Sequence, residues 1–503
     1  MFSNYWILAI IVIGIAATIG WTWQKRIRYQ PLKSVPSPPR HWLLGNIPQV
    51  SAAIKKKQFF KLLFDWSQQY GPVYVLWSAQ PILVLSQPTV IEETIVNGMR
   101  DGSLARSKTA SEAWNEISGP ILLGTSGSEW KWRRKAWNPE FSASGLAPYI
   151  SVVQPACSQV IEALKAAGPS EKVQIDALFV ELTMRVIANL LLGIPVDSRA
   201  ANSTGQPLDV PKFYQAMSVL GYRFLRVATG EKSWKKYLPL KSSREYWAAR
   251  RYLEDFLTPY VDSALRFRSE SIEGGPAPML AKIAAKESRY TRETLIAESI
   301  ELLIAGTDTT AHSLSFAVGE LALHPEVLQK AQAVVDQVWQ KYGAFSLDSL
   351  KDLSYIRAIF KETLRLYSVA SGSTSLETTR QTTIQDITVP PDTKVFWSML
   401  GAGRDPSTYS EPDKFRPERW LENGKELHSL PMIDFGSGSH RCLGEHLAML
   451  EATIMLAQLL HSFTWKLVNG RASLENLQQN LLIYPADGMP VQMEARVAVP
   501  SVA

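Results

Sequence analysis

Apolar residues recur at helical spacing through most of the chain. The stretches with this spacing are 130–137, 150–166, 175–192, 243–268, 293–323, 326–342, 352–367 and 443–462. Two short runs of β-type composition, 73–77 and 82–85, are separated by a turn-forming stretch and predict an early hairpin. Loop-type stretches at 196–207 and 273–278 are followed by no clear shift in composition. The pattern therefore predicts one large, mainly α-helical domain with a smaller β-rich part.

The amino-terminal residues form a separate, strongly apolar segment. Residues 5–23 carry no charge and would span roughly 28 Å as an α-helix, close to the hydrocarbon thickness of a bilayer. Aromatic residues lie at both ends, and basic residues follow, which by the positive-inside rule leaves the rest of the chain in the cytosol. These residues are Tyr5, Trp6, Trp21, Trp23, Lys25, Arg26, Arg28 and Lys33. A cleaved signal peptide is the alternative, but its basic residues would precede a shorter apolar run.

We therefore divide the chain into four parts. Residues 1–4 are the luminal or external terminus, 5–23 a transmembrane anchor, 24–40 a basic and proline-rich hinge, and 41–503 the folded domain. The prolines make the hinge a non-helical spacer. The prediction is a single-pass membrane protein with a cytosolic domain, in the endoplasmic reticulum if the source is eukaryotic.

Composition narrows the classes of function. The chain is 46% hydrophobic and 20% charged, which is typical of a globular protein. Cys157 and Cys442 are its two cysteines, which excludes a disulfide framework and metal centres built from several cysteines. A net charge of +6 over 503 residues is mild. Because nucleic-acid-binding proteins concentrate basic residues more strongly, we expect no nucleic-acid partner.

The stretch 435–444, FGSGSHRCLG, carries the strongest chemical signal. Glycines around Cys442 permit tight turns and close approach to a flat ligand, and a helical pattern follows. The positive end of a helix dipole favours a thiolate over a thiol, and a thiolate can serve as the axial ligand of a metal. The alternatives are a buried structural cysteine, a nucleophile paired with His440 or His446, and a zinc site. A zinc site would need more ligands than the sequence offers near Cys442. A nucleophilic cysteine would need an acid that orients the histidine, and no distinct one is found.

This stretch resembles the haem-binding loop of the cytochrome P450 superfamily, F-x-x-G-x-[R/H]-x-C-x-G. Phe435, Gly438, His440, Cys442 and Gly444 occupy the motif positions. The resemblance implies a cytochrome P450 fold and a haem b (iron protoporphyrin IX) with Cys442 as the axial ligand of its iron. His440 stands where the family more often has an arginine that contacts a haem propionate.

A second candidate site is AGTDTT, 305–310, in the middle of a long helical stretch. Threonines in a helix can donate to carbonyl groups one turn back, so the segment is expected to widen locally and leave carbonyls free. On its own the stretch would more often be a polar helix turn or the end of a helix. Asp308 and Thr309 resemble the family's acid–alcohol pair, which implies a role in delivering protons to bound oxygen.

A third set of residues is structural. Glu362 and Arg365 lie three apart on a helix and can pair, although such pairs are usually exposed and contribute little. They resemble the family's E-x-x-R. Arg419 in FRPERW, with Trp420 in place of the family's Phe, resembles the arginine that joins the pair. The resemblance implies a buried trio that fixes a loop against the haem-binding core.

A fourth set concerns the haem propionates. Trp130 and Arg134 share one helical face and resemble the family's W-x-x-x-R, although a basic surface helix would explain the spacing alone. Arg380 in LETTRQT is a further candidate partner for a propionate.

The resemblance implies a monooxygenase that inserts one atom of O2 into a lipophilic small molecule. No G-x-G-x-x-G fingerprint for a flavin or nicotinamide is present, so electrons are expected from an external donor, an NADPH-dependent flavoprotein reductase or a ferredoxin. Basic residues near the thiolate, Lys131, Arg133, Lys135 and Arg441, are candidates for its docking face. The aromatic and basic region 211–256 is a candidate roof of the substrate pocket.

Two alternatives to a monooxygenase remain. One is a haem-thiolate isomerase or dehydratase that acts without O2. The other is a non-catalytic, membrane-tethered haem-binding protein. Asp308 and Thr309 disfavour both, because neither needs an acid–alcohol pair for delivering protons.

Overall fold

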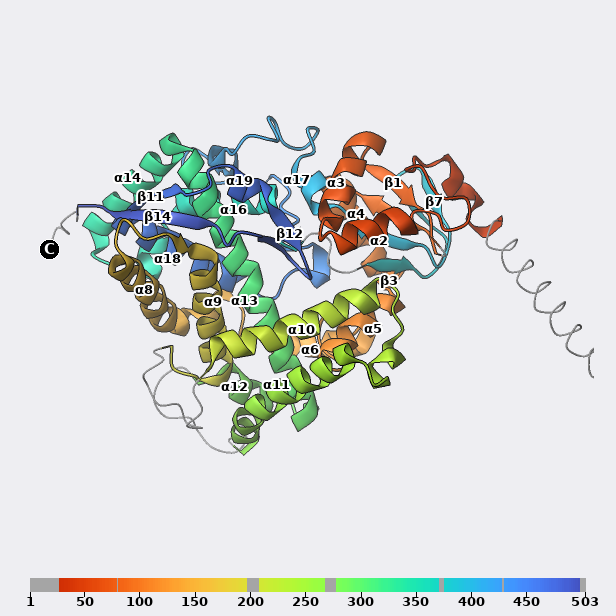
Figure 1. Ribbon diagram of the computed structural model, residues 1–503, viewed down its shortest axis with the longest axis horizontal. Coiled ribbons are helices and arrows are strands. Elements are labelled where there is room, and N and C mark those ends of the chain that lie inside the picture. Colours follow the sequence, from red (N-terminus) through yellow and green to blue (C-terminus); the bar gives the residue numbers. More distant parts are fainter. Residues whose placement is uncertain are drawn as a thin grey trace, which may run out of the picture.

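The longest described helix, α13 (Arg292–Leu323), runs through the middle of the folded body (Figure 1). The computed structural model describes residues 27–78, 80–196, 208–266, 277–370, 375–427 and 429–497. Most of α13 is buried on every side, which explains why its sequence is apolar without a polar stripe. Thr291 and Thr294 form a capping box at its first turn.

Helices from distant parts of the sequence pack around α13, including α9, α11, α16 and α18. The α-helices are α2 (Ile47–Lys55), α3 (Phe59–Tyr70), α4 (Pro88–Asp101), α5 (Lys108–Ile117), α6 (Gly127–Trp137), α7 (Ala143–Leu146), α8 (Ile150–Ala167), α9 (Ile175–Leu192), α10 (Val210–Ala228), α11 (Lys241–Arg266), α12 (Met279–Lys286), α13, α14 (Pro325–Tyr342), α15 (Leu347–Leu350), α16 (Ser354–Tyr367), α17 (Met399–Gly403), α18 (Glu445–Ser462) and α19 (Ala472–Glu475). The 3-10 helices are η1 (Gln30–Ser34), η2 (Ala147–Tyr149), η3 (Ser233–Tyr237), η5 (Pro417–Trp420) and η6 (Gly438–His440).

The mainly helical architecture is confirmed, and each helix predicted from periodicity is present with ends within a few residues of the prediction. The predictions name no helix between residues 47 and 117, where α2 to α5 alternate with short strands. Each of these helices covers only a few turns. It therefore contains too few apolar positions for a helical period to be distinguished from the pattern of the adjoining strands.

The β-rich part is a five-stranded sheet of order β1-β2-β8-β5-β3, in which only β2 and β8 pair in parallel. The predicted hairpin is confirmed: Val73 pairs with Leu85 and Leu76 with Ile82. The strands are β1 (Val73–Leu76), β2 (Ile82–Leu85), β3 (Leu104–Arg106), β4 (Val173–Gln174), β5 (Leu376–Thr378), β6 (Thr382–Ile384), β7 (Ile387–Val389), β8 (Lys394–Trp397), β9 (Leu421–Glu422), β10 (Lys425–Glu426), β11 (Phe463–Leu467), β12 (Leu477–Gln479), β13 (Ile483–Pro485) and β14 (Pro490–Ala495).

The segment expected to act as a hinge is in part a packed element. Pro31 begins the 3-10 helix η1, where proline is tolerated because the first N–H has no helical partner, so the prediction of a non-helical spacer is wrong there. Leu32 is fully buried, and the carbonyl of Pro36 accepts a hydrogen bond from the Val75 N–H. The folded body therefore begins before residue 41.

The predicted anchor, residues 5–23, lies outside the described residues. Within the ranges listed above, no helix combines the length and the apolar composition that a membrane crossing requires.

Gly403, at the end of α17, allows the closest approach between α16 and α17. A Cβ atom there would lie 2.0 Å from the carbonyl oxygen of Arg365. We predict that Gly403→Ala lowers the free energy of unfolding by about 2 kcal/mol or more, because neither backbone can yield without disturbing the packing. Urea denaturation followed by circular dichroism measures the change.

Gly221, in the interior of α10, is the matched control, because a Cβ atom there would have no neighbour closer than 3.8 Å. Gly221→Ala should leave stability unchanged or raise it by up to about 1 kcal/mol through helix propensity. Equal effects of the two substitutions would contradict the packing explanation.

Candidate active site

The loop that precedes α18 folds into a tight turn around Cys442. The Cys442 N–H donates to the carbonyl of Phe435 at 2.6 Å, and the Gly436 N–H donates to that of Ile433 at 2.8 Å. Gly436 and Gly438 have φ values of +74° and +65°, a region that side chains with a Cβ rarely adopt. The glycines of the motif therefore shape the turn that presents the sulfur atom.

The two cysteines have opposite surroundings. Cys157 is fully buried in the core on α8, and burial raises the pKa of its thiol. Cys442 is exposed. Burial is nevertheless the largest influence on the pKa of its thiol and raises that pKa, while the Gly444 backbone and Arg134 lower it. The Cys442 side chain thus keeps accessible surface although protein surrounds most of it. Of the two cysteines, Cys442 is the one that a ligand can reach.

The middle of α13 shows the same combination. Ala305, Gly306, Asp308 and Thr309 keep accessible surface, whereas the stretches of α13 on both sides are almost entirely buried. The Thr309 hydroxyl donates to the Ala305 carbonyl at 2.7 Å, as expected for threonine in a helix. These residues therefore interrupt the burial of the central helix halfway along its length.

The expected widening of α13 is not found, because the helix remains α-helical through 305–310. Gly306 has a packing role instead: a Cβ atom there would lie 2.9 Å from a side-chain carbon of Ile187 on α9. The glycine thus lets α9 and α13 cross closely.

Asp308 is poised to exchange a proton near neutral pH. Its Oδ1 atom is buried without a hydrogen-bond partner among the described residues. Burial raises the pKa of this carboxyl to about 6, and Asp176 adds to the rise, while His312 and the Tyr214 hydroxyl oppose it. Tyr214 lies on α10, so the region predicted to roof the pocket does reach this site.

Trp130 and His440 come together from α6 and the cysteine loop. Their rings stack with centroids 3.9 Å apart and planes 20° from parallel. Burial, followed by the charges of Arg106 and Arg134, lowers the pKa of His440 to about 4. Arg134 makes no hydrogen bond or ion pair with the described residues, and burial lowers the pKa of its guanidinium too. Two guanidinium groups thus lie near His440, and the charge of Glu301 acts on one of them, Arg106.

Arg106, at the end of β3, is a member of this group that the sequence analysis missed. Its Nε and Nη1 atoms are buried without a partner among the described residues, and burial lowers the pKa of its guanidinium to about 10. A buried and unpaired cation is unfavourable unless an anion joins it. No motif marks this position, and only its burial reveals it. Arg106, Arg134 and the Trp130 and His440 rings fit a ligand with two carboxylates, as haem has.

A family model described as Cytochrome P450 matches residues 35–492. The chain belongs to the cytochrome P450 family. Members are haem-thiolate monooxygenases that bind haem through a cysteine thiolate, so this protein is a monooxygenase-class oxidoreductase with a haem cofactor.

Relatives of this cytochrome P450 are distant and span nearly its whole length. It is 27% identical to the putative cytochrome P450 cyp-13B1 of Caenorhabditis elegans, over 90% of this chain and 93% of the relative. It is 26% identical to cytochrome P450 736A117 of Prunus mume, with 93% and 92% covered, and 25% identical to cytochrome P450 71B26 of Arabidopsis thaliana, with 93% of each covered.

Arg380 does not join the cationic group of this P450. Its side chain is 57% exposed, lies 3.3 Å from the Asp101 carboxylate and donates to the Asp101 carbonyl at 3.1 Å. It follows β5 by two residues, beyond the last position whose side chain the sheet buries, Thr378. The exposed position of Arg380 therefore does not support the predicted contact with a propionate.

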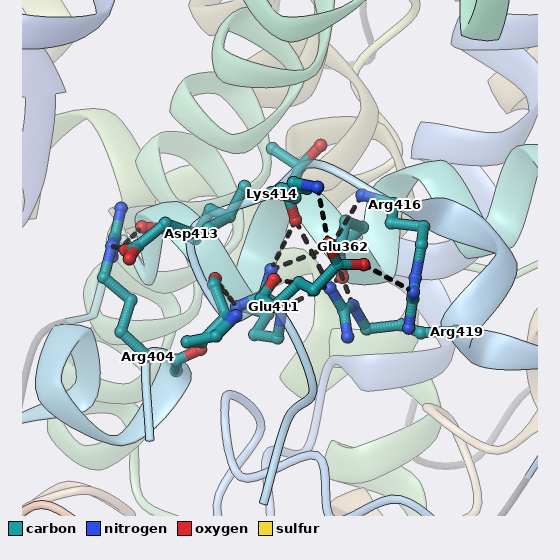
Figure 2. A network of polar contacts seen from close by, with 12 residues as sticks. Glu362, Arg404, Glu411, Asp413, Lys414, Arg416 and Arg419 are labelled. Atoms are coloured by element: carbon teal, nitrogen blue, oxygen red, sulfur yellow. Dashed lines mark hydrogen bonds and ion pairs between the residues drawn. The ribbon is translucent and has the colours of Figure 1, made fainter. Parts of the chain in front are cut away.

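The predicted trio of Glu362, Arg365 and Arg419 is in contact and buried, and Figure 2 shows Arg419 beside Glu362. Arg365 donates to both oxygens of Glu362 at 2.8 and 2.9 Å, and Arg419 donates at 2.9 Å. The Trp420 indole and the Arg416 backbone N–H each add a bond of 2.9 Å. Five donors thus surround one carboxylate, and no part of the Glu362 side chain is exposed.

The remaining donors of the two arginines hold the loop between α17 and η5. Arg365 donates to the carbonyls of Pro412 at 2.6 Å and Lys414 at 3.1 Å, and Arg419 donates to that of Ser410 at 2.7 Å. The trio is therefore a bridge between α16 and a loop without regular structure.

One residue of the predicted docking face is internal. Arg133 is buried and forms ion pairs with Glu129 and Glu298, so it cannot meet a partner protein. Lys131, Lys135 and Arg441 do reach the surface.

We predict that Arg106→Gln weakens haem binding. Loss of a charged hydrogen-bond donor at a buried carboxylate costs about 1.5–3 kcal/mol, which corresponds to at least about a tenfold faster loss of haem. Transfer of haem to excess apomyoglobin, followed by absorbance, measures the rate. Arg380→Gln is the control and should behave like the unmodified protein; a faster loss in that variant alone would reverse the assignment.

We predict that Glu362→Gln destabilises the fold by about 3–5 kcal/mol, because two buried guanidinium groups lose their shared counter-charge. The midpoint of urea denaturation measures the effect. Glu162→Gln, at the exposed pair with Lys165, removes the same charge from a surface contact and should leave the midpoint almost unmoved. Comparable losses in both variants would refute a special role for the enclosed carboxylate.

Proposed function

We propose that this cytochrome P450 inserts one atom of O2 into a lipophilic small molecule, with Cys442 as the axial haem ligand and Asp308 and Thr309 as the residues that move protons. The observation that carries the proposal is the interruption in the burial of α13, where this acid and this alcohol keep accessible surface. When bound, haem supplies the binding and reductive activation of O2. The protein residues hold the group and control where protons go.

Haem binding would draw on two sets of residues. Cys442 offers a sulfur atom in a loop whose turn is held by Gly436 and Gly438. Arg106 and Arg134 offer cationic donors to the haem carboxylates, together with the stacked pair of Trp130 and His440.

Proton delivery would use the chemistry of Asp308. With a pKa raised to about 6, its carboxyl is mostly protonated below that pH and mostly ionised above it, so it can both hold and release a proton under ordinary conditions. Thr309, the next residue, places a hydroxyl at the same point of the helix. An isomerase or a haem-binding scaffold would have no use for this arrangement.

Electrons would come from a separate protein, an NADPH-dependent flavoprotein reductase or a ferredoxin. Lys131, Lys135 and Arg441 supply exposed positive charge near the cysteine loop, which suits an acidic partner. Arg441 also pairs with Glu445, so its charge is partly offset.

We also propose that residues 5–23 anchor the protein in a membrane, with the folded domain in the cytosol and, in a eukaryote, on the endoplasmic reticulum. Large apolar side chains that stay exposed close to the amino-terminal end of the folded body support contact with a membrane surface. They include Trp42 at 85% and Leu43 at 67% exposure.

We predict that the reduced protein with carbon monoxide shows the red-shifted Soret band of a thiolate-ligated haem. Cys442→Ala should abolish the band, because the thiolate donor is gone, and Cys157→Ala should keep it. Absorbance difference spectra measure both.

If the unmodified protein lacks the band, the assignment of the ligand is wrong. Substrate conversion that continues without O2 and without a reductase would instead favour an isomerase or dehydratase.

A further inference from the structure

A buried histidine lies one helical turn beyond the proposed proton donor. His312 follows Asp308 by four residues on α13, so both occupy the same face of the helix. Its Nδ1 atom is 2.8 Å from Oδ1 of Asp176, the second residue of α9. Ser315 donates to the same Asp176 oxygen at 2.7 Å. The carboxylate therefore fixes both the position and the orientation of the imidazole ring.

The members of the cluster differ in how far they are enclosed. The His312 side chain is 4% exposed and the Asp176 side chain is 13% exposed, so Asp176 offers more contact with solvent than the ring that it holds. Asp308 also keeps some accessible surface, although its Oδ1 atom is buried.

Other groups that face His312 are tyrosines. The ring of Tyr484, on β13, lies 5.9 Å from the imidazole, and Tyr214, on α10, contacts Asp308. The Tyr484 hydroxyl accepts a hydrogen bond from Lys57 and donates one to Gln478, each at 3.0 Å. The charged neighbours of the ring are thus the carboxylates of Asp176 and Asp308.

A purely structural role for His312 would explain its bond to Asp176. It would not explain why His312 lies one turn from Asp308, an acid whose Oδ1 atom has no partner among the described residues. Imidazole has two nitrogen atoms, so it can accept a proton at one and release a proton at the other without leaving its position. Because Nδ1 is held by Asp176, Nε2 is the atom left for exchange.

We propose that His312, oriented by Asp176, returns protons from solvent to Asp308 each time Asp308 gives one up beside Thr309. This inference rests on the proposed function. In each cycle Nε2 of the imidazolium loses one proton to the Asp308 carboxylate and then regains one from water, while Nδ1–H stays bonded to Asp176, so protons balance and no electrons move. His312 and Asp176 act through Asp308 and are therefore positioning residues.

Infrared titration of the full-length holoenzyme tests the link directly. The carboxyl band that disappears in Asp308→Asn reports the protonation of Asp308. In His312→Gln the apparent pKa from this band should rise, because the carboxylate loses the attraction of a nearby positive ring. Asp176→Asn provides a second variant if the first does not fold. A band that titrates identically in every variant would overturn the proposal.

His461→Gln is the matched control. His461 is also a partly buried histidine whose Nδ1 atom faces an aspartate, at 3.3 Å from Asp336, but it lies at the end of α18. This substitution should not move the Asp308 band.

A kinetic measurement separates a relay from a structural role. With NADPH and a flavoprotein reductase, and no added substrate, His312→Gln should consume O2 about tenfold more slowly. This is less than the roughly hundredfold low end for direct proton transfer, because His312 acts through Asp308. The variant should also show a larger solvent hydrogen isotope effect. In the Asp308→Asn background, His312→Gln should not slow O2 consumption further, because the carboxyl that would receive the proton from His312 is absent. An additional loss there would overturn the proposal.

Carbon monoxide difference spectra of the same samples keep the two hypotheses apart. If the thiolate-type band is present in all variants and O2 consumption by His312→Gln equals that of the unmodified protein, the relay is wrong and the proposed function stands. If the unmodified protein lacks the band, the proposed function fails first.

Discussion

The carboxylate of Glu362 is the interaction on which the rest of the structure depends. An ionised group without any contact with water is unfavourable by many kcal/mol unless its oxygens are fully engaged, and Glu362 has five donors. Those donors belong to α16 and to the segment from Arg416 to the end of η5. The chain can therefore bury this charge only by bringing both segments to one place, and the cysteine loop follows η5 in the sequence.

The candidate active site contains buried polar groups that, unlike Glu362, are not fully engaged. Nε and Nη1 of Arg106 and Oδ1 of Asp308 are buried and have no hydrogen-bond partner within the part of the chain that the structure describes. Such groups are unfavourable for stability, as is usual where a protein prepares a site for another molecule. Haem carboxylates would satisfy the cations, while the unpartnered oxygen of Asp308 remains free for proton exchange. Stability is thus concentrated around Glu362 and given up around Cys442.

Local motifs in the sequence predicted the parts of the site in which the partners lie a few residues apart. The turn around Cys442, the pair of Glu362 and Arg365, and the polar turn at Thr309 belong to this class. Arg106 and the pair of His312 and Asp176 could not be predicted in this way, because their partners come from elements more than a hundred residues away. The errors have the same origin. Arg380 and Arg133 have suitable side chains at plausible spacing. Arg380 follows β5 and points outward, whereas Arg133 on α6 points into the core.

The packing of η1 has a mechanical consequence for the protein as a whole. Arg28 forms an ion pair with Asp392, and Leu32 is inserted beneath the sheet, so the chain is fixed to the body almost as soon as it leaves the proposed anchor. The residues between Trp23 and Arg28 could extend over at most about 18 Å. If residues 5–23 anchor the chain, a tether of that length would keep the body from tumbling freely above a bilayer. It would restrict the angles at which the body meets the lipid, so the packing of η1 would set the orientation of the body on the membrane.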